Sequence, residues 1–307
     1  MGTDRLESGE SVRRSVGGRR FAEARIVASV LRSDPLSVGA LALILLVVSV
    51  GVFAPLIAPY KEDILGIPRP GYKFLPPSLS HLFGTDYLGR DVFSLVLMGA
   101  RISLMAGLLV VVLSLLIGCP LGVIAGYFRG TVVDEVIMRV TDIFLALPPL
   151  LLAIAIAATL GPGLENAMIA TAISWWPWYT RLMRAQAASL RERPFVEAAR
   201  GLGVSELAIV FRHILPNALA PVIVQATMDI GSAILFTSAL SFLGLGAQPP
   251  TPEWGLMVNL GRRYIRNYWW YVTFPGLAIF VTVMAFNVLG DGLRKALDPR
   301  LRMRRAG

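Results

Sequence analysis

Charged side chains are scarce in this sequence. Asp, Glu, Lys and Arg make up 16% of the 307 residues, whereas soluble domains contain about 25%. A water-soluble protein of this length can bury a large core, but its surface still requires charge. The hydrophobic residues, 55% of the chain, fall in long runs. The sequence therefore excludes an ordinary soluble domain and predicts an integral membrane protein.

Cysteine and histidine are almost absent. Cys119 is the only cysteine, which excludes an internal disulfide, and its place within an apolar run indicates a packing role. The two histidines, His81 and His213, belong to segments predicted on opposite sides of the membrane. We therefore expect no histidine metal cluster, no catalytic triad, no cofactor and no enzyme activity in this chain alone.

The net charge of +9 does not indicate a nucleic-acid partner. Nucleic-acid sites need a basic stripe interleaved with exposed aromatic side chains, and the sequence has none. The basic residues gather instead in a few polar segments between the apolar runs. This is the distribution that the positive-inside rule gives to the cytoplasmic loops of membrane proteins.

Six apolar runs are long enough to cross a bilayer, since about 20 residues span the hydrocarbon core as a helix. They are residues 36–58, 103–127, 136–160, 165–187, 216–245 and 271–289. Each must be helical, because lipid offers no partner to free backbone N–H and C=O groups. The sequence thus predicts an all-α membrane protein with six transmembrane helices, kinked at Pro120, at Pro148–Pro149 and at Pro177.

The Lys and Arg residues predict the orientation. With both termini in the cytoplasm, 21 of the 29 basic residues lie on that side. The resulting order is a cytoplasmic tail (1–35), a first transmembrane helix (36–58), an extracytoplasmic loop (59–100), a core of five transmembrane helices (101–290) and a second cytoplasmic tail (291–307).

Aromatic residues crowd the entrance to the last predicted transmembrane helix. They are Tyr264, Tyr268, Trp269, Trp270 and Tyr271. Tyr and Trp are enriched where transmembrane helices meet the lipid headgroups. The pattern therefore predicts an aromatic belt at the extracytoplasmic surface, in preference to a ligand site.

The longest cytoplasmic loop, residues 188–215, contains a short predicted helix. Pro194 suits the first turn of a helix, and Glu197 lies near the positive end of the helix dipole. Gly201 and Gly203 are expected to end the helix, after which a second short helix leads into the next transmembrane segment. The loop is therefore predicted to hold a short helix outside the bilayer.

Two alanines give this short helix a small, smooth face, which suits either a simple interfacial connector or a knob for a groove in another protein. The run Glu197-Ala198-Ala199, with Gly203 and Leu215-Pro216 at their spacings, resembles the EAA loop of bacterial ABC-importer permeases, with His213 where the general pattern has Ile. That resemblance implies docking on a cytoplasmic ATPase subunit. The residues assigned to coupling on this basis are Glu197, Ala198, Ala199, Arg200, Gly201, Gly203, Leu215 and Pro216.

Three further stretches narrow the resemblance. They read HLFGTDYLGRDV at 81–92, LSFLGLG at 240–246 and FNVLGDGLR at 286–294. From about residue 36 to 302 the chain resembles the C-type subunit of the dipeptide, oligopeptide and nickel permease family. The resemblance implies a type I ABC-importer permease fold and import of di- or oligopeptides. It also implies a heterodimer with a homologous permease, two ATPase domains that use ATP and Mg, and an extracytoplasmic peptide-binding protein.

Two sets of polar residues lie within the predicted transmembrane helices. Gln225, Asp229 and Ser232 follow helical spacing and form one polar stripe, which we expect to face the transport pathway or the seam with the partner permease, and not lipid. Arg139 and Asp142 are three residues apart near the cytoplasmic end of the third helix. This spacing predicts a structural ion pair between them.

Other functions remain open on the residues alone. A nickel or other small-solute importer of the same family has the same motifs, and an acidic residue that often occurs in the fifth helix of that family is Thr237 here. An ion-coupled secondary transporter would use Asp229 as its coupling carboxylate, but such proteins usually contain internal repeats, and none is clear in this sequence. A membrane scaffold without transport would leave the short cytoplasmic helix and the polar stripe unexplained.

Overall fold

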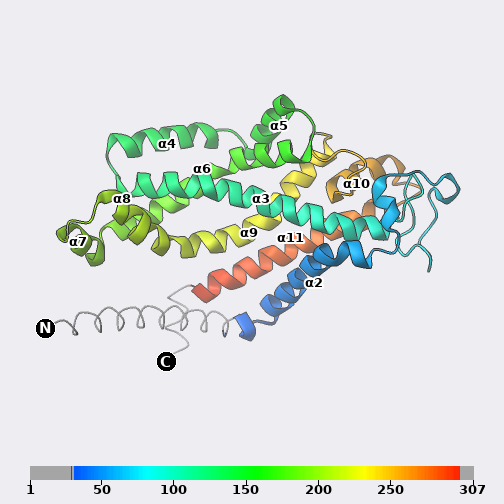
Figure 1. Ribbon diagram of the computed structural model, residues 1–307, viewed down its shortest axis with the longest axis horizontal. Coiled ribbons are helices and arrows are strands. Elements are labelled where there is room, and N and C mark those ends of the chain that lie inside the picture. The colour runs from blue at the N-terminus through cyan, green and yellow to red at the C-terminus, as the bar shows by residue number, and fades with distance from the viewer. Residues whose placement is uncertain (1–28, 30, 298–307) are drawn as a thin grey trace, which may run out of the picture.

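The computed structural model describes residue 29 and residues 31–297, and every regular element in that part of the chain is a helix (Figure 1). The long helices are α2 (Pro35–Ile57), α3 (Val92–Tyr127), α6 (Leu164–Arg191), α9 (Leu215–Phe242) and α11 (Trp270–Leu297). The shorter ones are α4 (Val132–Leu145), α5 (Pro149–Leu160), α7 (Pro194–Gly201), α8 (Glu206–Ala208) and α10 (Trp254–Gly261). Single 3₁₀ turns are η1 (Lys61–Leu65), η2 (Pro70–Tyr72) and η4 (Arg262–Tyr264), and η3 (Ile209–Ile214) is a π turn. The predicted all-α fold is confirmed; the predicted tails, 1–35 and 291–307, fall largely outside the described residues.

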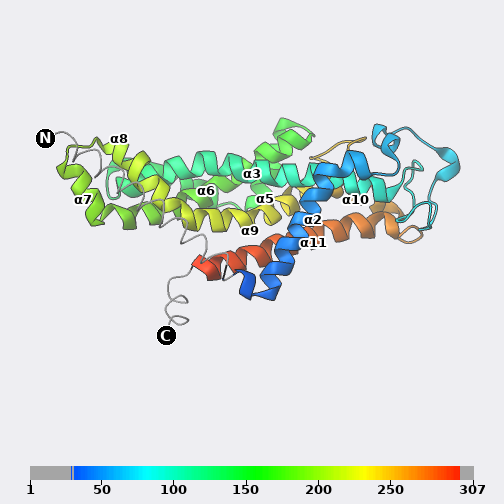
Figure 2. The ribbon, with the colours of Figure 1, turned by 60° about the horizontal axis from the view of Figure 1, so that its bottom comes forward.

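The helices form an elongated bundle. Helices α3, α6 and α9 run along its long axis, with α7 at one end and the loop between α2 and α3 at the other (Figure 1). Helices α2 and α11 pack on each other and cross the bundle on one side (Figure 2). The start of α2 meets the end of α11, where a Cβ added at Gly292 would lie 2.1 Å from Ser37 Oγ.

The most extensive helix pair, α3 with α6, is built on three glycines spaced four residues apart. A Cβ added at Gly118, Gly122 or Gly126 would lie 2.6, 2.5 and 2.4 Å from a backbone oxygen of α6. Small residues at this spacing let two transmembrane helices bring their backbones together. We refer to these three glycines as the glycine seam; it holds α3 and α6 as one unit.

Four helical stretches are long and apolar enough to cross a membrane: α2, α3, the continuous run Glu206–Phe242 and α11. Helices α4 and α5 meet that criterion only together, and they bend by 87° at the break between them. The predicted third span, 136–160, is therefore not one kinked helix. Pro149 cannot donate a backbone hydrogen bond and disfavours a helical residue before it, so α4 stops at Leu145 and α5 starts afresh.

Helix α6 has 28 residues but is not among these apolar helices. Its middle carries Trp175, Trp176, Trp178 and Tyr179, and its second half carries arginines. These side chains lower its hydropathy, and most of its middle is buried among α3, α5 and α9. Of the six predicted transmembrane helices, composition and length thus support four directly and a fifth if the bent pair counts as one.

Helix α3 begins at Val92, about three turns before the predicted start at residue 103. The Asp91 carboxylate caps it by accepting a hydrogen bond from Ser94 N–H at 2.8 Å. The added turns pack on α10, where the Trp254 indole N–H donates to Val96 O at 3.0 Å. The predicted loop 59–100 therefore ends at residue 91, and residues 92–100 belong to α3.

The loop before α3 is held by buried ionic contacts. The Arg90 guanidinium pairs with Asp86 at 2.7 Å, and His81 Nδ1 lies 2.9 Å from Asp91 Oδ1. The Asp63 carboxylate accepts a hydrogen bond from Asp91 N–H at 2.7 Å, and burial raises the pKa of Asp63 above its usual value. These contacts give the loop between α2 and α3, residues 58–91, a defined folded structure; we refer to it as the loop cap.

The predicted aromatic belt is wrong for Trp270 and Tyr271. Trp270 and Tyr271 are buried, and Tyr268 stacks on Phe74 of the loop cap with ring centroids 4.0 Å apart. The Trp270 indole N–H donates to Thr85 O at 3.2 Å. These side chains fasten the cap to α11, and Trp269 is the one of the five whose side chain is half exposed.

Candidate functional site

Helix α7 forms the tip of the molecule, at the opposite end from the loop cap (Figure 1). Pro194 occupies its first turn, as predicted, and the side chain of Val196 is fully buried beneath it. The helix ends with Leu202 N–H donating to Ala198 O at 3.1 Å and Gly203 N–H donating to Arg200 O at 2.9 Å. Gly203 is the residue that breaks the helix, because its φ of +74° lies in the left-handed region.

The two alanines of α7 do not share a face. Ala198 is exposed, whereas Ala199 is buried against the rest of the loop. Neighbouring residues on a helix point about 100° apart, so a pair at i and i+1 cannot form a single flat surface. The predicted small face of two alanines is therefore not formed: Ala198 lies at the surface, and Ala199 belongs to the core.

Arg200 is engaged within the chain. Its guanidinium lies 5.2 Å from the centroid of the Tyr127 ring, and its Nη2 donates to the Tyr127 hydroxyl at 2.9 Å. The same hydroxyl donates to the Glu206 carboxylate, which also lies 3.9 Å from Arg200 Nε. Arg200 thus fastens α7 to the end of α3 and to α8, and a role in coupling would be to hold α7 in place.

Large apolar side chains stay exposed around α7. Leu202 is 84% exposed and Leu207 63%, and Phe195 and Phe211 are each about two-fifths exposed. We call these four residues the apolar tip. Sequence reasoning missed them, although a leucine directly after a helix-ending glycine and phenylalanines at both ends of a polar loop were a readable signal. Such a surface is suited to a protein partner.

The chain runs from the tip into α9 without a break. Helix α8, the π turn at Ile209–Ile214 and α9 form one continuous helical stretch, in which Leu215 N–H donates to Val210 O. Pro216, at the start of α9, has no N–H, so the α-helical hydrogen bond is lost there and the backbone widens into a π turn. The sequence predicted that a transmembrane helix starts at Pro216. The helical stretch instead continues from α8 through Pro216 into α9.

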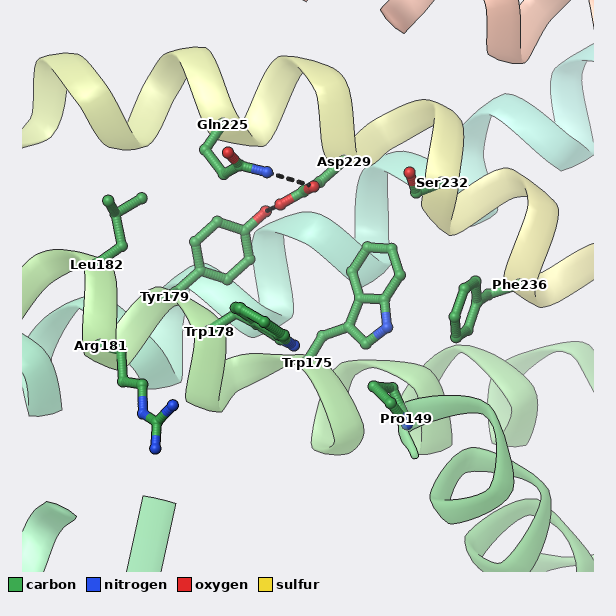
Figure 3. A pocket seen from close by; sticks show the side chains of 10 residues that line it. All are labelled: Pro149, Trp175, Trp178, Tyr179, Arg181, Leu182, Gln225, Asp229, Ser232 and Phe236. Atoms are coloured by element: carbon green, nitrogen blue, oxygen red, sulfur yellow. Dashed lines mark hydrogen bonds between the residues drawn. The ribbon is translucent and has the colours of Figure 1, made fainter. Parts of the chain in front are cut away.

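The predicted polar stripe lines a cavity of about 640 Å³ between α6 and α9 (Figure 3). The Tyr179 hydroxyl donates to Asp229 Oδ2 at 2.6 Å, and Gln225 Nε2 donates to Asp229 Oδ1 at 2.9 Å. The full lining is Pro149, Trp175, Trp178, Tyr179, Arg181, Leu182, Gln225, Asp229, Ser232 and Phe236. All three stripe residues thus face a common space, whose role in transport stays a prediction.

Thr237 does not line this cavity. It is buried, and its hydroxyl donates to the carbonyls of Ala233 and Ile234 in its own helix. The carboxylate that this chain offers inside α9 is Asp229, two turns earlier. With Thr237 in place of an acidic residue, Asp229 is the carboxylate that α9 presents to the cavity.

The predicted ion pair between Arg139 and Asp142 is wrong. Arg139 lies 3.7 Å from Glu135 one turn earlier, and Asp142 pairs with Arg181 of α6 at 2.7 Å. Helix α6 also sends Arg184 to Asp134, with two hydrogen bonds of 2.6 and 2.8 Å. The carboxylates of Asp134 and Asp142 face α6, so they pair with its arginines, whereas Arg139 pairs with Glu135 along α4.

Residues 118–303 match the family of binding-protein-dependent transport system inner membrane components, and residues 24–77 match the N-terminal transmembrane domain of oligopeptide transport permease C. The chain belongs to this permease family. It is a multi-pass protein of the inner membrane, and the resemblance inferred from the residues is confirmed.

Curated relatives cover nearly the whole permease. It is 46% identical over 281 residues to the probable D,D-dipeptide transport system permease protein DdpC of Escherichia coli strain K12, covering 92% of this chain and 93% of the relative. It is 47% identical to the dipeptide transport system permease protein DppC of Alkalihalophilus pseudofirmus, covering 89% and 88%. It is 46% identical to the glutathione transport system permease protein GsiD of Escherichia coli O6:K15:H31, covering 88% of each.

Solved structures support the fold. Two crystal forms of the MetNI methionine ABC transporter, both described as inward facing, align with a TM-score of 0.53 and 20% sequence identity. The first alignment covers 67% of the permease and 98% of the transporter chain, and the second covers 66% and 97%. The predicted type I ABC-importer permease fold is confirmed at the level of architecture.

Proposed function

We propose that this permease is the transmembrane subunit of an ATP-driven importer that carries di- or oligopeptides into the cytoplasm. The observation that carries the proposal is the near full-length similarity to permeases whose names specify dipeptides, D,D-dipeptides and glutathione. A nickel substrate has no comparable support among these relatives. The substrate itself would be delivered by an extracytoplasmic peptide-binding protein.

The partners follow from the same family. The permease would pair with a homologous second permease, and two cytoplasmic ATPase domains would supply ATP and Mg. Helix α7 and the apolar tip would dock on an ATPase domain, with the run 197–203 at the contact and Leu215-Pro216 joining it to α9. Exposed leucines and phenylalanines beside a short helix are the kind of surface that fits a partner's groove.

The coupling would be a population shift. ATP binding closes the ATPase pair, and the two docked α7 helices would move together and favour the outward-open state of the two permeases. A ligand shifts such an equilibrium only by its differential affinity for the two states. The strength of the α7 contact therefore limits how firmly ATP controls the pathway.

The first experiment is to tag this chain, extract it in mild detergent and identify the proteins that co-purify. We expect a second permease and ATPase subunits with P-loops. Reconstituted with its binding protein, the complex is expected to take up alanyl-alanine only in the presence of ATP. A stable lone chain that takes up peptide in response to a proton gradient would overturn the proposal.

Two variants sharpen this experiment. Ala198→Arg places a bulky cation on the exposed face of α7, and Gly203→Asp disturbs the turn that ends it; both should stay in the membrane and lose ATP-dependent uptake. Gly71→Ala, in the loop between α2 and α3 at the other end of the molecule (Figure 1), is the matched control, because nothing lies within 4 Å of a Cβ added there. Wild-type uptake by the first two variants would refute the coupling role of α7.

A further inference from the structure

Asp229 is a carboxylate on α9 that faces the cavity between α6 and α9. Its two side-chain contacts come from neutral donors, the Tyr179 hydroxyl and the Gln225 amide. In the part of the chain that the structure describes, no Lys, Arg or His forms an ion pair with it. An ionisable residue at this depth is costly, and a protein keeps one there for a function.

The other acids at this level of the bundle are neutralised. Asp134 and Asp142 of α4 each pair with an arginine of α6, namely Arg184 and Arg181. Among the described residues, the two carboxylates on the α4 side of α6 have arginine partners, and the carboxylate on the α9 side has none. A cation that enters the cavity would supply the opposite charge.

The cavity suits a small organic cation. Trp175, Trp178 and Phe236 line it, and the faces of such rings attract cations. Arg181 also lines it, but its guanidinium pairs with Asp142 at 2.7 Å and points away from Asp229 (Figure 3). Its volume of about 640 Å³ falls within the range of small-molecule sites. A carboxylate has about four acceptor positions, and the contacts from Tyr179 and Gln225 occupy two of them. Asp229 therefore retains acceptor capacity for an ammonium group.

We propose that Asp229 is the counter-ion for a primary ammonium group of the solute as it passes this cavity, with the aromatic walls receiving the apolar part of the solute. Tyr179 and Gln225 are positioning residues, because each holds one carboxylate oxygen. The inference rests on the proposed peptide import, since every unblocked peptide carries an α-ammonium group. It adds to that function a charge-selective site within this subunit.

The site is tested without transport by a cysteine probe. Ser232 lines the cavity three residues from Asp229, and the native Cys119 is buried, so Ser232→Cys introduces an accessible thiol. In the intact purified complex, this thiol is treated with a cationic methanethiosulfonate, the ethylammonium reagent, and with an anionic one, the ethylsulfonate reagent. We expect the cation to react about tenfold faster than the anion, because an unpaired charge nearby changes each rate by electrostatics.

Removing the charge should remove the preference. In the Ser232→Cys background, Asp229→Asn keeps the shape of the side chain and is expected to bring the two rates together, whereas Asp229→Glu restores most of the difference. Tyr179→Phe should reduce the difference only in part. The matched control is Glu165→Gln, which neutralises an exposed carboxylate at the start of α6, away from the cavity; it should leave the ratio unchanged.

Peptide protection identifies the chemical group. Alanyl-alanine at millimolar concentration should slow the labelling of the probe thiol, and N-acetyl-alanyl-alanine, which lacks the ammonium group, should not. The charge preference and the protection are read in complexes that retain both permeases and the ATPases, which excludes misfolding as a cause.

Either of two results would overturn the inference while leaving peptide import intact: equal labelling by both reagents, or equal protection by both peptides, in complexes that still import alanyl-alanine. Protection by an inorganic cation alone would overturn it in favour of an ion site. Failure of the unmodified complex to import any peptide would instead refute the proposed function.

Discussion

Two groups of glycines in this permease have opposite surroundings. One group lies in the close-packed contact between α3 and α6, and the other lies at the tip, where the space around it is empty. In the glycine seam, a Cβ on any of the three residues would meet α6 backbone within 2.6 Å. At the tip, nothing lies within 4 Å of a Cβ added at Gly201 or Gly203. The seam requires glycine for lack of space, whereas Gly203 requires it for its positive φ.

The comparison separates two demands on one chain. A pair of helices that must move as a unit has its backbones in close contact, because lipid supplies no hydrophobic force to hold helices together. A surface that must receive another protein keeps its neighbourhood empty and its apolar side chains exposed. Substitutions in the two regions should therefore fail in different ways: loss of the fold at the seam and loss of the partner at the tip.

The largest effect is expected from Gly122→Leu in the seam. The Cβ alone would lie 2.5 Å from Thr180 O and 2.7 Å from Met183 Cβ, so α3 and α6 must separate. Overpacking of this kind costs about 3 kcal/mol, and more where backbones must move. The apparent melting temperature in detergent should fall sharply and the yield of assembled complex with it. Leu116→Ala, on the exposed side of the same helix, should change neither; equal stability of both variants would show that the seam is not close-packed.

A smaller effect is expected from Gly203→Val at the tip. A β-branched residue held at a φ of +74° is strained by about 2 kcal/mol, and this strain acts on the end of α7 alone. Limited proteolysis should cut the loop 188–215 faster, while the melting temperature of the bundle stays near that of the wild type. A fall in melting temperature as large as that of Gly122→Leu would contradict the separation of the two regions.

Leu202→Asp should leave the stability of the isolated subunit unchanged and abolish its binding to the ATPase subunits. The side chain is 84% exposed and makes no packing contribution to lose, so stability should change by less than about 0.5 kcal/mol. A carboxylate on the apolar tip must be desolvated when an ATPase domain covers it. Pull-down of the ATPase subunits is expected to drop at least tenfold; retention at the wild-type level would place the contact elsewhere.

The smallest effect is expected from Gly201→Ala. This residue ends α7 in helical conformation with open space around it, so alanine fits and restricts the unfolded chain. We expect unchanged or slightly slower proteolysis of the loop and normal ATP-dependent uptake. Loss of uptake would mean that the partner's surface approaches this glycine too closely to accommodate a methyl group.

Much of the architecture was readable from the sequence. The apolar runs predicted the helical class, because lipid leaves no alternative to a helix. The motif around Glu197 and Gly203 predicted a short helix outside the bilayer and the place where it ends. The helical spacing of Gln225, Asp229 and Ser232 predicted one polar face, and these residues do line one cavity.

What failed depended on contacts between segments far apart in the chain. Asp142 pairs with Arg181, and not with Arg139, because α4 lies against α6. Trp270 and Tyr271, at the start of α11, are buried because the loop cap folds back on them, which composition cannot indicate. The glycine seam was not predicted, although its spacing of four residues is a readable signal for a close helix contact.

The stretch from Glu206 to Phe242 is helical throughout, so the tip and the cavity lie on one continuous helix. Asp229 follows Pro216 by 13 positions, or roughly 20 Å along the helix. Two places in this stretch yield more easily than a regular α-helix: the π turn at Ile209–Ile214, and Pro221, whose missing N–H removes one α-helical hydrogen bond. A displacement of α7 is therefore either absorbed at one of these two places or transmitted along the helix to the carboxylate in the cavity.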